Sequence, residues 1–330
     1  MQLRFAKPRA SAAIPAAVVA ICLIVLGALA VRARLAAPEH PPAWRRSSDG
    51  SRTVYVDFHP RHTREGWHGE PPVAFFKPVD RKPSIALTFD CGWVEEANGM
   101  KILDFLKARS LRATFFISGP FVFHDYRKGA AGGLNQANLR MIRRMIEDGH
   151  EFGSHSQTHP HNSVWIDWER ENDELRRAWE AATREAFGET PPGNARMLPF
   201  WRAPFGEYDD RSLRMASRAG FPLHVGWTVD VHDGLGLPRC GDAASHVRCI
   251  DAKRMTDRVV DHVDSTGARF EGLVVLAHLQ NAYDWTGTPD GLARLVDVLS
   301  ERGVALRPLS AIFNWDLAPD VRRLSPASAP

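Results

Sequence analysis

Two histidines four residues apart, His155 and His159 in the stretch HSQTH, have the type and spacing of a metal-binding pair. Both imidazoles can reach one ion if the segment coils just after a strand. A divalent ion held there would lower the pKa of a bound water and polarise an amide carbonyl, which suits hydrolysis of a poor electrophile. The alternative is a pair of loop histidines whose ring nitrogens are satisfied by hydrogen bonds.

Other ionisable side chains also follow apolar, strand-like runs. They are Asp90 and Cys91 after IALTF, Arg202 in RAPFG, Asp233 in DVHD, and His278 at the end of LAH. In α/β folds the carboxyl ends of parallel strands meet at one edge, and catalytic groups gather there. The sequence therefore predicts one shared site.

The elements that would position these residues alternate along the chain. Apolar runs predict strands at 84–89, 113–117, 151–154, 197–201, 224–228, 273–277 and 304–308. Amphipathic stretches between them predict helices at 100–108, 137–147, 165–187, 211–218, 252–263 and 291–302. This alternation predicts an α/β fold with a parallel sheet, either open or closed into a barrel.

The N-terminal part has a different composition. Residues 12–31 form an uncharged run long enough to span a bilayer, and more basic residues precede it than follow it. We expect a membrane anchor with the catalytic domain outside the cytoplasm, on the periplasmic or extracellular face. The alternative is a removed signal, with Ala28 and Ala30 at the cleavage site, and a secreted protein.

The composition excludes some partners. With 44% hydrophobic and 25% charged residues the chain is typical of a globular protein, and its formal charge of +3 indicates no nucleic-acid partner. It has neither a Walker loop nor a Rossmann fingerprint, so we expect no nucleotide cofactor. After export, Cys240 and Cys249 in CGDAASHVRC could close a small disulfide ring, or they are two unrelated thiols.

Five segments together resemble the polysaccharide deacetylases, the chitooligosaccharide deacetylase-like enzymes of carbohydrate esterase family 4 with a NodB homology domain. They are TFDCG (88–92), HSQTH (155–159), RAPFG (202–206), WTVDVHD (227–233) and LAH (276–278). The resemblance implies an irregular (β/α) barrel of about seven parallel strands that removes acetyl groups from N- or O-acetylated sugars. We divide the chain into an anchor or signal (1–34), a tether and short extension (35–82), a deacetylase domain (83–314) and a loose tail (315–330).

The resemblance also implies residue roles. Asp90 matches the general base that takes a proton from the metal-bound water, and His278 matches the acid that protonates the departing amine. Arg202 matches the arginine that pairs with the base and keeps it ionised. Asp233 lies where the family has an acid that tunes the catalytic histidine, although Asp230 could compete for that role.

Substrate contacts follow from the same match. Leu276 would line the pocket for the acetyl methyl group. Trp93, which follows TFDCG, and Phe205, within RAPFG, are candidates for sugar contacts. The segment 124–138 is longer than a tight connection needs and could overhang the groove.

Two positions depart from the family pattern. Cys91 stands where most members have a second aspartate that ligates the metal. It either ligates zinc, the divalent ion that best suits a thiolate and two imidazoles, or is not a ligand, or marks an impaired metal site. Gly234 stands where many members have tryptophan, so one wall of the groove would be built differently.

The sequence thus favours a metal-dependent N-deacetylase that acts on a cell-envelope or extracellular polysaccharide, either peptidoglycan or an exopolysaccharide. Two alternatives stay open: a non-catalytic glycan-binding relative with a decayed metal site, and another hydrolase, such as an O-acetyl esterase, on the same scaffold.

Overall fold

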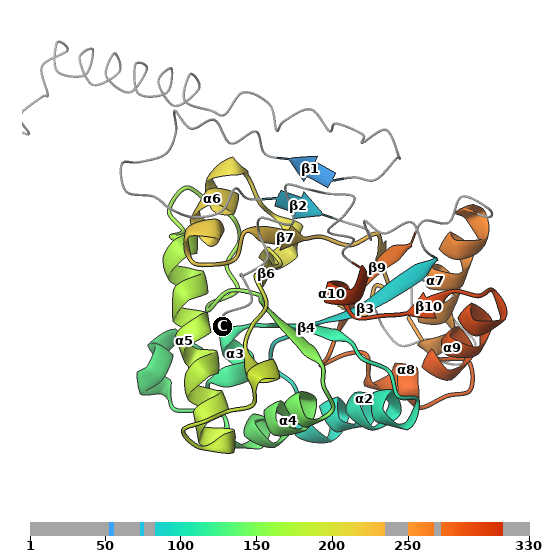
Figure 1. The fold of residues 1–330 in the computed structure, drawn as a ribbon, viewed down its shortest axis with the longest axis horizontal. Helices are drawn as coiled ribbons and strands as arrows, with labels where there is room; N and C mark the ends of the chain where they lie inside the picture. The colour runs from blue at the N-terminus through green and yellow to red at the C-terminus, as the bar shows by residue number, and fades with distance from the viewer. Residues whose placement is uncertain (1–52, 56–72, 76–82, 235–249, 267–271, 313–330) are drawn as a thin grey trace, which may run out of the picture. The chain divides into compact units, whose positions relative to one another are not determined.

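The computed structural model describes residues 53–55, 73–75, 83–234, 250–266 and 272–312 (Figure 1). The predicted anchor or signal at 12–31 and the cysteines Cys240 and Cys249 lie outside these residues, so neither prediction is tested. None of the described helices is long and apolar enough to cross a membrane.

The strands form one curled sheet that is parallel throughout, except for one antiparallel pair at its edge (Figure 1). Its order is β1-β2-β7-β6-β5-β4-β3-β9-β8, and β10 also pairs with β3. The strand bounds are β1 Thr53–Tyr55, β2 Val73–Phe75, β3 Ser84–Cys91, β4 Thr114–Ile117, β5 Glu151–Ser154, β6 Phe200–Trp201, β7 Leu223–Val225, β8 Val229–Asp230, β9 Leu273–His278 and β10 Ala305–Leu306. Each predicted strand run contains or overlaps an observed strand, which confirms the parallel α/β fold as an open, curled sheet.

Helices connect the strands. They are α2 Glu96–Ala108, α3 Gly119–Val122, α4 Gln136–Glu147, α5 Trp168–Phe187, α6 Asp210–Arg218, α7 Ala252–Thr266, α8 Tyr283–Thr286, α9 Leu292–Glu301 and α10 Leu309–Ile312, with 3-10 turns η2 Tyr126–Gly132, η3 Gly193–Ala195 and η4 Pro204–Gly206. Asp167 caps the start of α5, and Asp209 and Ser212 form a capping box on α6. These caps explain why both helices begin where they do.

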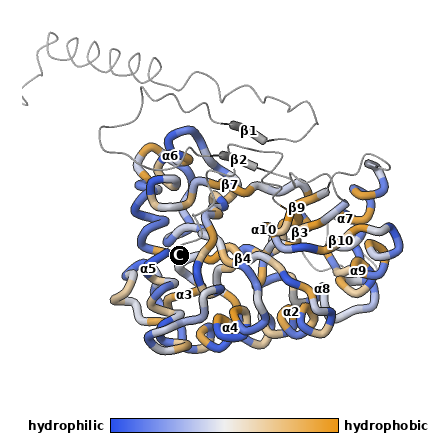
Figure 2. Tube along the Cα trace, in the orientation of Figure 1, coloured by the Kyte–Doolittle hydropathy of each residue, from blue (hydrophilic) through white to orange (hydrophobic). Residues whose placement is uncertain are grey.

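The two faces of β3 show how the core is divided. Ile85, Leu87, Phe89 and Cys91 pack into the main core, which lies between the sheet and helices such as α2 and α4. Ala86 and Thr88 point to the other face of β3. There Ala86 packs inside the curled sheet, in a cluster that includes residues of α10. Figure 2 shows β3, β4 and β9 as mostly hydrophobic, whereas the helices are mixed. The face that carries Ala86 and Thr88 also carries Asp90, because side chains alternate along a strand.

Gly153 on β5 allows a close approach between strands that a side chain would prevent. A Cβ there would lie 2.9 Å from the Phe116 ring and 2.9 Å from the Phe200 carbonyl oxygen. We expect Gly153→Ala to lower the free energy of unfolding in urea by about 1–3 kcal/mol. The control is Gly193→Ala, where an added Cβ meets nothing within 4 Å. An equal loss in both variants would contradict this account.

Candidate active site

Side chains from separate strand ends meet at the carboxyl edge of the sheet. Asp90 is the next-to-last residue of β3, His155 follows β5, Arg202 follows β6 and His278 ends β9. Nη1 of Arg202 donates to Asp90 Oδ1 at 2.8 Å, and His155 Nε2 lies 3.3 Å from Asp90 Oδ2. His278 is the register partner of Asp90 on the neighbouring strand. The structure therefore brings together residues that the sequence places almost two hundred positions apart.

Arg202 is fully buried and its guanidinium is surrounded by acceptors. Besides Asp90, it donates to the carbonyl oxygens of Val225 at 3.0 Å and Gly226 at 3.2 Å, and it lies 4.1 Å from the centre of the Phe116 ring. Burial acts to raise the pKa of Asp90, but its neighbours outweigh it and hold the pKa below its usual value; among them Arg202, which is always charged, supplies both a positive charge and a hydrogen bond. Asp90 is thus a carboxylate at neutral pH.

The hydrogen bond at the back of His155 fixes its tautomer. Its Nδ1 lies 2.8 Å from the carbonyl oxygen of Arg202, which can only accept, so Nδ1 carries the proton. Burial lowers the pKa of His155, and burial with the nearby His155 lowers that of His159 to about 3. Both rings are therefore neutral, and His155 presents an unprotonated Nε2 to the site.

Two further groups face this Nε2. It lies 3.1 Å from Nε2 of His159 and 3.3 Å from the carboxylate of Asp90. The two Nε2 atoms are within hydrogen-bond distance of each other, and two imidazoles beside a carboxylate are ligands that zinc accepts. The residues therefore suit a divalent ion, although in the described part of the chain no group of three or more His, Cys, Asp or Glu side chains is arranged as a ligand set.

Cys91 does not lie with these groups. Its side chain is fully buried on the core face of β3, and its thiol donates to the carbonyl oxygen of Phe89 at 3.6 Å. Burial, together with the charge of Asp90, raises the pKa of Cys91 well above its usual value, so the thiol keeps its proton. This placement disagrees with the prediction that Cys91 ligates zinc and favours the non-ligand alternative.

The surroundings of His278 shift its pKa in the opposite direction to those of His155 and His159. Its Nδ1 lies 2.8 Å from Asp233 Oδ1, and its backbone N–H donates to Asp233 Oδ2 at 2.7 Å. Burial acts to lower the pKa of His278, but the hydrogen bond and charge of Asp233 outweigh it and raise the pKa. Asp230, the competing candidate, instead accepts from the backbone N–H of His232.

Gly234 leaves room for the His278 ring. A Cβ at Gly234 would lie 2.3 Å from His278 Cε1 and 2.7 Å from its Nδ1. Any side chain at this position would displace the imidazole in its present orientation and weaken its bond to Asp233. The missing tryptophan is thus part of how this chain places His278.

The predicted substrate residues take different positions. Leu276 is buried on β9, on the face that also carries His278. Trp93 is 63% exposed and meets Tyr126 edge-on, with ring centres 5.2 Å apart. Phe205 is 52% exposed, has a left-handed backbone with φ 58°, and lies between His159 and His161 at 4.7 and 3.8 Å. The Phe205 ring borders the site through His159, and Trp93 follows β3, the strand that carries Asp90.

Glu171 on α5 is a supporting residue that the sequence analysis missed. Its carboxylate accepts from the backbone N–H and the hydroxyl of Thr158, at 2.7 and 2.9 Å, and its carbonyl oxygen accepts from Gln157. This brace holds the loop that carries both histidines, in which Ser156 and His159 have positive φ. The only sequence signal was an acid in the first turn of the helix after HSQTH.

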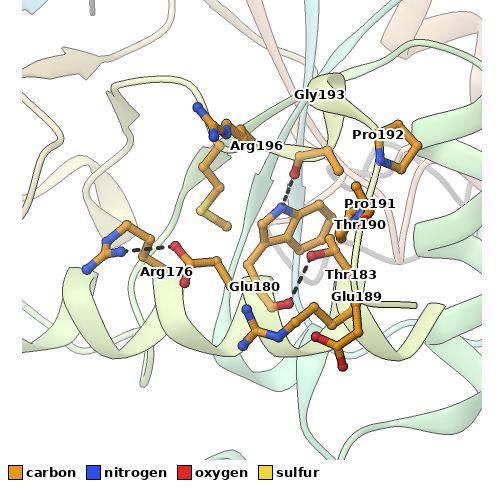
Figure 3. Close-up of a pocket in the computed structure, with 13 residues that line it drawn as sticks. Arg176, Glu180, Thr183, Glu189, Thr190, Pro191, Pro192, Gly193 and Arg196 are labelled. Atoms are coloured by element: carbon orange, nitrogen blue, oxygen red, sulfur yellow. Dashed lines mark hydrogen bonds and ion pairs between the residues drawn. The ribbon is translucent and has the colours of Figure 1, made fainter. Parts of the chain in front are cut away.

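A pocket of about 700 Å³ lies away from these residues, between the C-terminal half of α5 and residues 189–197 (Figure 3). Trp179 lines it and donates to the carbonyl oxygen of Ala195 at 2.6 Å, and Arg176 pairs with Glu180 at 3.0 Å. The residues that line this pocket precede β6, so they belong to the opposite end of the strands. None of the predicted site residues lines it.

Comparisons with known proteins place this sequence and its fold among the polysaccharide deacetylases. The family model described as polysaccharide deacetylase matches residues 77–224. A chitooligosaccharide deacetylase from Sinorhizobium fredii is 30% identical over 69% of this chain and 90% of its own length. A peptidoglycan-N-acetylglucosamine deacetylase from Bacillus cereus is 28% identical over 75% of this chain and 74% of its own length. The fold is similar to that of a chitin deacetylase from Colletotrichum lindemuthianum, with a TM-score of 0.54 at 22% identity over 73% of this chain and 91% of that one.

The Asp233–His278 pair predicts a pH effect. Because Asp233 raises the pKa of His278, the histidine holds its proton to a higher pH than it otherwise would. We expect Asp233→Asn to lower that pKa, so that the alkaline limb of the kcat profile moves to lower pH. The profile of acetate release measures this. A limb that stays in place while kcat falls would show that Asp233 acts by positioning alone.

Proposed function

Because this chain belongs to the polysaccharide deacetylase family, an enzyme family of hydrolases that act on carbon–nitrogen bonds other than peptide bonds, we propose that it removes acetyl groups from the N-acetylated sugars of a cell-envelope polysaccharide. One observation carries the proposal. A carboxylate paired with a buried arginine lies on the strand beside a histidine whose pKa an aspartate raises. These are the base and the acid that amide hydrolysis needs.

The chain's own residues move the protons. Asp90 uses Oδ1 to bind Arg202, which leaves Oδ2 to accept a proton from the attacking water. His278 uses Nδ1 to bind Asp233, so Nε2 is the atom that donates to the departing sugar amine. Without that proton the tetrahedral intermediate would expel oxygen more readily than nitrogen. Leu276, on the face of His278, would line the acetyl-methyl pocket.

His155 and His159 would hold a divalent cation, with zinc the first candidate because both ligands are neutral imidazoles. Such a cation supplies Lewis acidity at the acetyl carbonyl and lowers the pKa of water. The Arg202 carbonyl oxygen orients His155 for this task, and Glu171 braces the loop that presents His159.

The names of the relatives support two substrate classes. The Bacillus cereus relative is named for peptidoglycan and the Sinorhizobium fredii relative for chitooligosaccharides. We propose a polymer of the cell envelope, because residues 12–31 have the composition of a membrane anchor that would place the catalytic domain outside the cytoplasm. Secretion after signal cleavage is the alternative.

The base and acid assignments can be tested directly. We expect Asp90→Asn and His278→Ala each to lower kcat for acetate release from N-acetylglucosamine oligomers by about 10²- to 10⁴-fold. Asp261→Asn, on the exposed side of α7, is the matched control. Full activity in either site variant would refute its assignment. No acetate release by the unaltered protein, with bound glycan, would favour the non-catalytic alternative.

Metal dependence has a separate test with two readouts. Elemental analysis of the purified protein should find a divalent metal, and a chelator should remove both the metal and the activity. We expect His155→Ala to lose the metal, whereas Cys91→Ala keeps it because the sulfur lies in the core. Loss of metal in Cys91→Ala, with a cooperative unfolding transition retained, would restore the thiol as a ligand.

A further inference from the structure

One polar residue interrupts the core-facing stripe of α5. Buried side chains recur along this helix at spacings of four and three residues, as in an amphipathic helix: they are Trp168, Asn172, Leu175, Trp179, Ala182 and Ala186. Every member of this stripe except Asn172 is hydrophobic, and Asn172 is completely buried. A buried amide costs stability unless it is hydrogen-bonded, so the partners of Asn172 indicate what it does.

Both ends of the Asn172 amide are used. Its Nδ2 donates to the carbonyl oxygen of Trp168 at 2.7 Å, and its Oδ1 accepts from the hydroxyl of Ser154 at 2.5 Å. Because a carbonyl oxygen can only accept, the bond to Trp168 fixes which way the amide points. Ser154 is also completely buried, and its Oγ accepts from the backbone N–H of Ser156 at 3.2 Å. Hydrogen bonds therefore run without a gap from α5 to the residue after His155.

Ser156 belongs to the loop at 155–159 that carries both histidines. Its backbone is left-handed, with φ 70°, and so is that of His159, with φ 54°. Residues other than glycine adopt this conformation at a cost in free energy, so the surrounding contacts must offset it. The loop turns back on itself, and the Nε2 atoms of His155 and His159 lie 3.1 Å apart. The position of the histidine pair therefore depends on what holds Ser156.

Helix α5 supports this loop at two points through consecutive residues. Glu171 accepts from the backbone N–H and the hydroxyl of Thr158, and Asn172 holds the other end of the loop through Ser154. Glu171 is partly exposed, whereas Asn172 and Ser154 are completely buried. Water cannot easily replace a hydrogen-bond partner that is lost inside the core, so the buried support is the more demanding of the two.

We propose that Asn172 is a positioning residue for the metal ligands: by holding Ser154, it keeps the turn at Ser156 in the form that lets both histidines bind one cation. This inference rests on the proposed metal-dependent deacetylase function and adds to it a residue that is not itself a ligand. A loop without this support has to be ordered when the cation binds, which weakens binding. The alternative is a purely structural role, in which Asn172 only ties α5 to β5.

Zinc binding separates these two roles, and it is measured on the purified full-length protein by competition with a chromophoric chelator. We expect Asn172→Leu, which makes the stripe fully apolar, and Ser154→Ala, which removes the linking hydroxyl, each to raise the Kd for Zn²⁺ by about 10- to 100-fold. Ser154→Thr, which keeps the hydroxyl, should bind zinc nearly as tightly as the unaltered protein.

Thr256→Ala is the matched control. The Thr256 hydroxyl is also completely buried, accepts from Trp285 at 2.9 Å and donates to the carbonyl oxygen of Gly291 at 2.9 Å. Its removal breaks two buried hydrogen bonds of a different helix, α7, and should lower the free energy of unfolding while leaving the Kd for Zn²⁺ unchanged.

Hydrogen exchange of the metal-free protein gives a readout that does not depend on the cation. We expect Asn172→Leu and Ser154→Ala to speed amide exchange in residues 154–159, because the N–H of Ser156 loses its acceptor or that acceptor loses its support. Exchange in this segment should be unchanged in Thr256→Ala.

Two results would overturn the inference. One is an unchanged Kd for Zn²⁺ in Asn172→Leu and Ser154→Ala, and the other is an equal rise in Thr256→Ala, which would trace the effect to general stability. If Asn172→Leu does not fold, the zinc affinity and hydrogen exchange of Ser154→Ala decide. Failure of the proposed function looks different, because the unaltered protein would then bind no zinc and release no acetate.

Discussion

The buried pair of Arg202 and Asp90 is the contact on which the site depends. In the sheet order β4 and β5 separate β3 from β6, so in a flat sheet the two strands would lie about 14 Å apart. The 2.8 Å contact between side chains that leave these strands requires the sheet to curl. Two charges without water are costly unless they are well hydrogen-bonded, and besides Asp90 the guanidinium donates to the carbonyl oxygens of Val225 and Gly226. Removing one partner would leave the other buried and unpaired, at a cost of about 3–5 kcal/mol.

Histidine has two proposed roles at this edge of the sheet, as a neutral metal ligand and as a proton donor, because the surroundings of the histidines differ. Burial dominates at His155 and His159, and their lowered pKa values keep both rings neutral, as metal ligands must be. At His278 the carboxylate of Asp233 outweighs burial, and the raised pKa favours a ring that can donate a proton. Gly234 contributes by leaving space for the ring. The different roles of these histidines therefore follow from the residues around them.

The sequence predicted the periodic elements and the gathering of ionisable groups at strand ends, because both follow from local patterns. It did not predict Glu171, since only the folded loop brings Thr158 to that carboxylate. It also left β8 unassigned, as Val229–Asp230 is too short to show a period. The position of Cys91 could have been anticipated: in IALTFDCGW, alternation puts Asp90 and Cys91 on opposite faces for as long as the strand continues, and β3 continues to Cys91.

With Cys91 in the core, the proposed cation depends on two imidazoles and the nearby carboxylate, and so on how well these are held. Arg202 acts on both parts at once. Its guanidinium keeps Asp90 ionised, while its carbonyl oxygen sets the tautomer of His155. Any shift of the strand end after β6 would therefore disturb the base and the ligand together. The guanidinium contacts give a physical reason for an arginine, rather than a lysine, at this position, because a single ammonium group could not satisfy Asp90, Val225 and Gly226 with the same planar geometry.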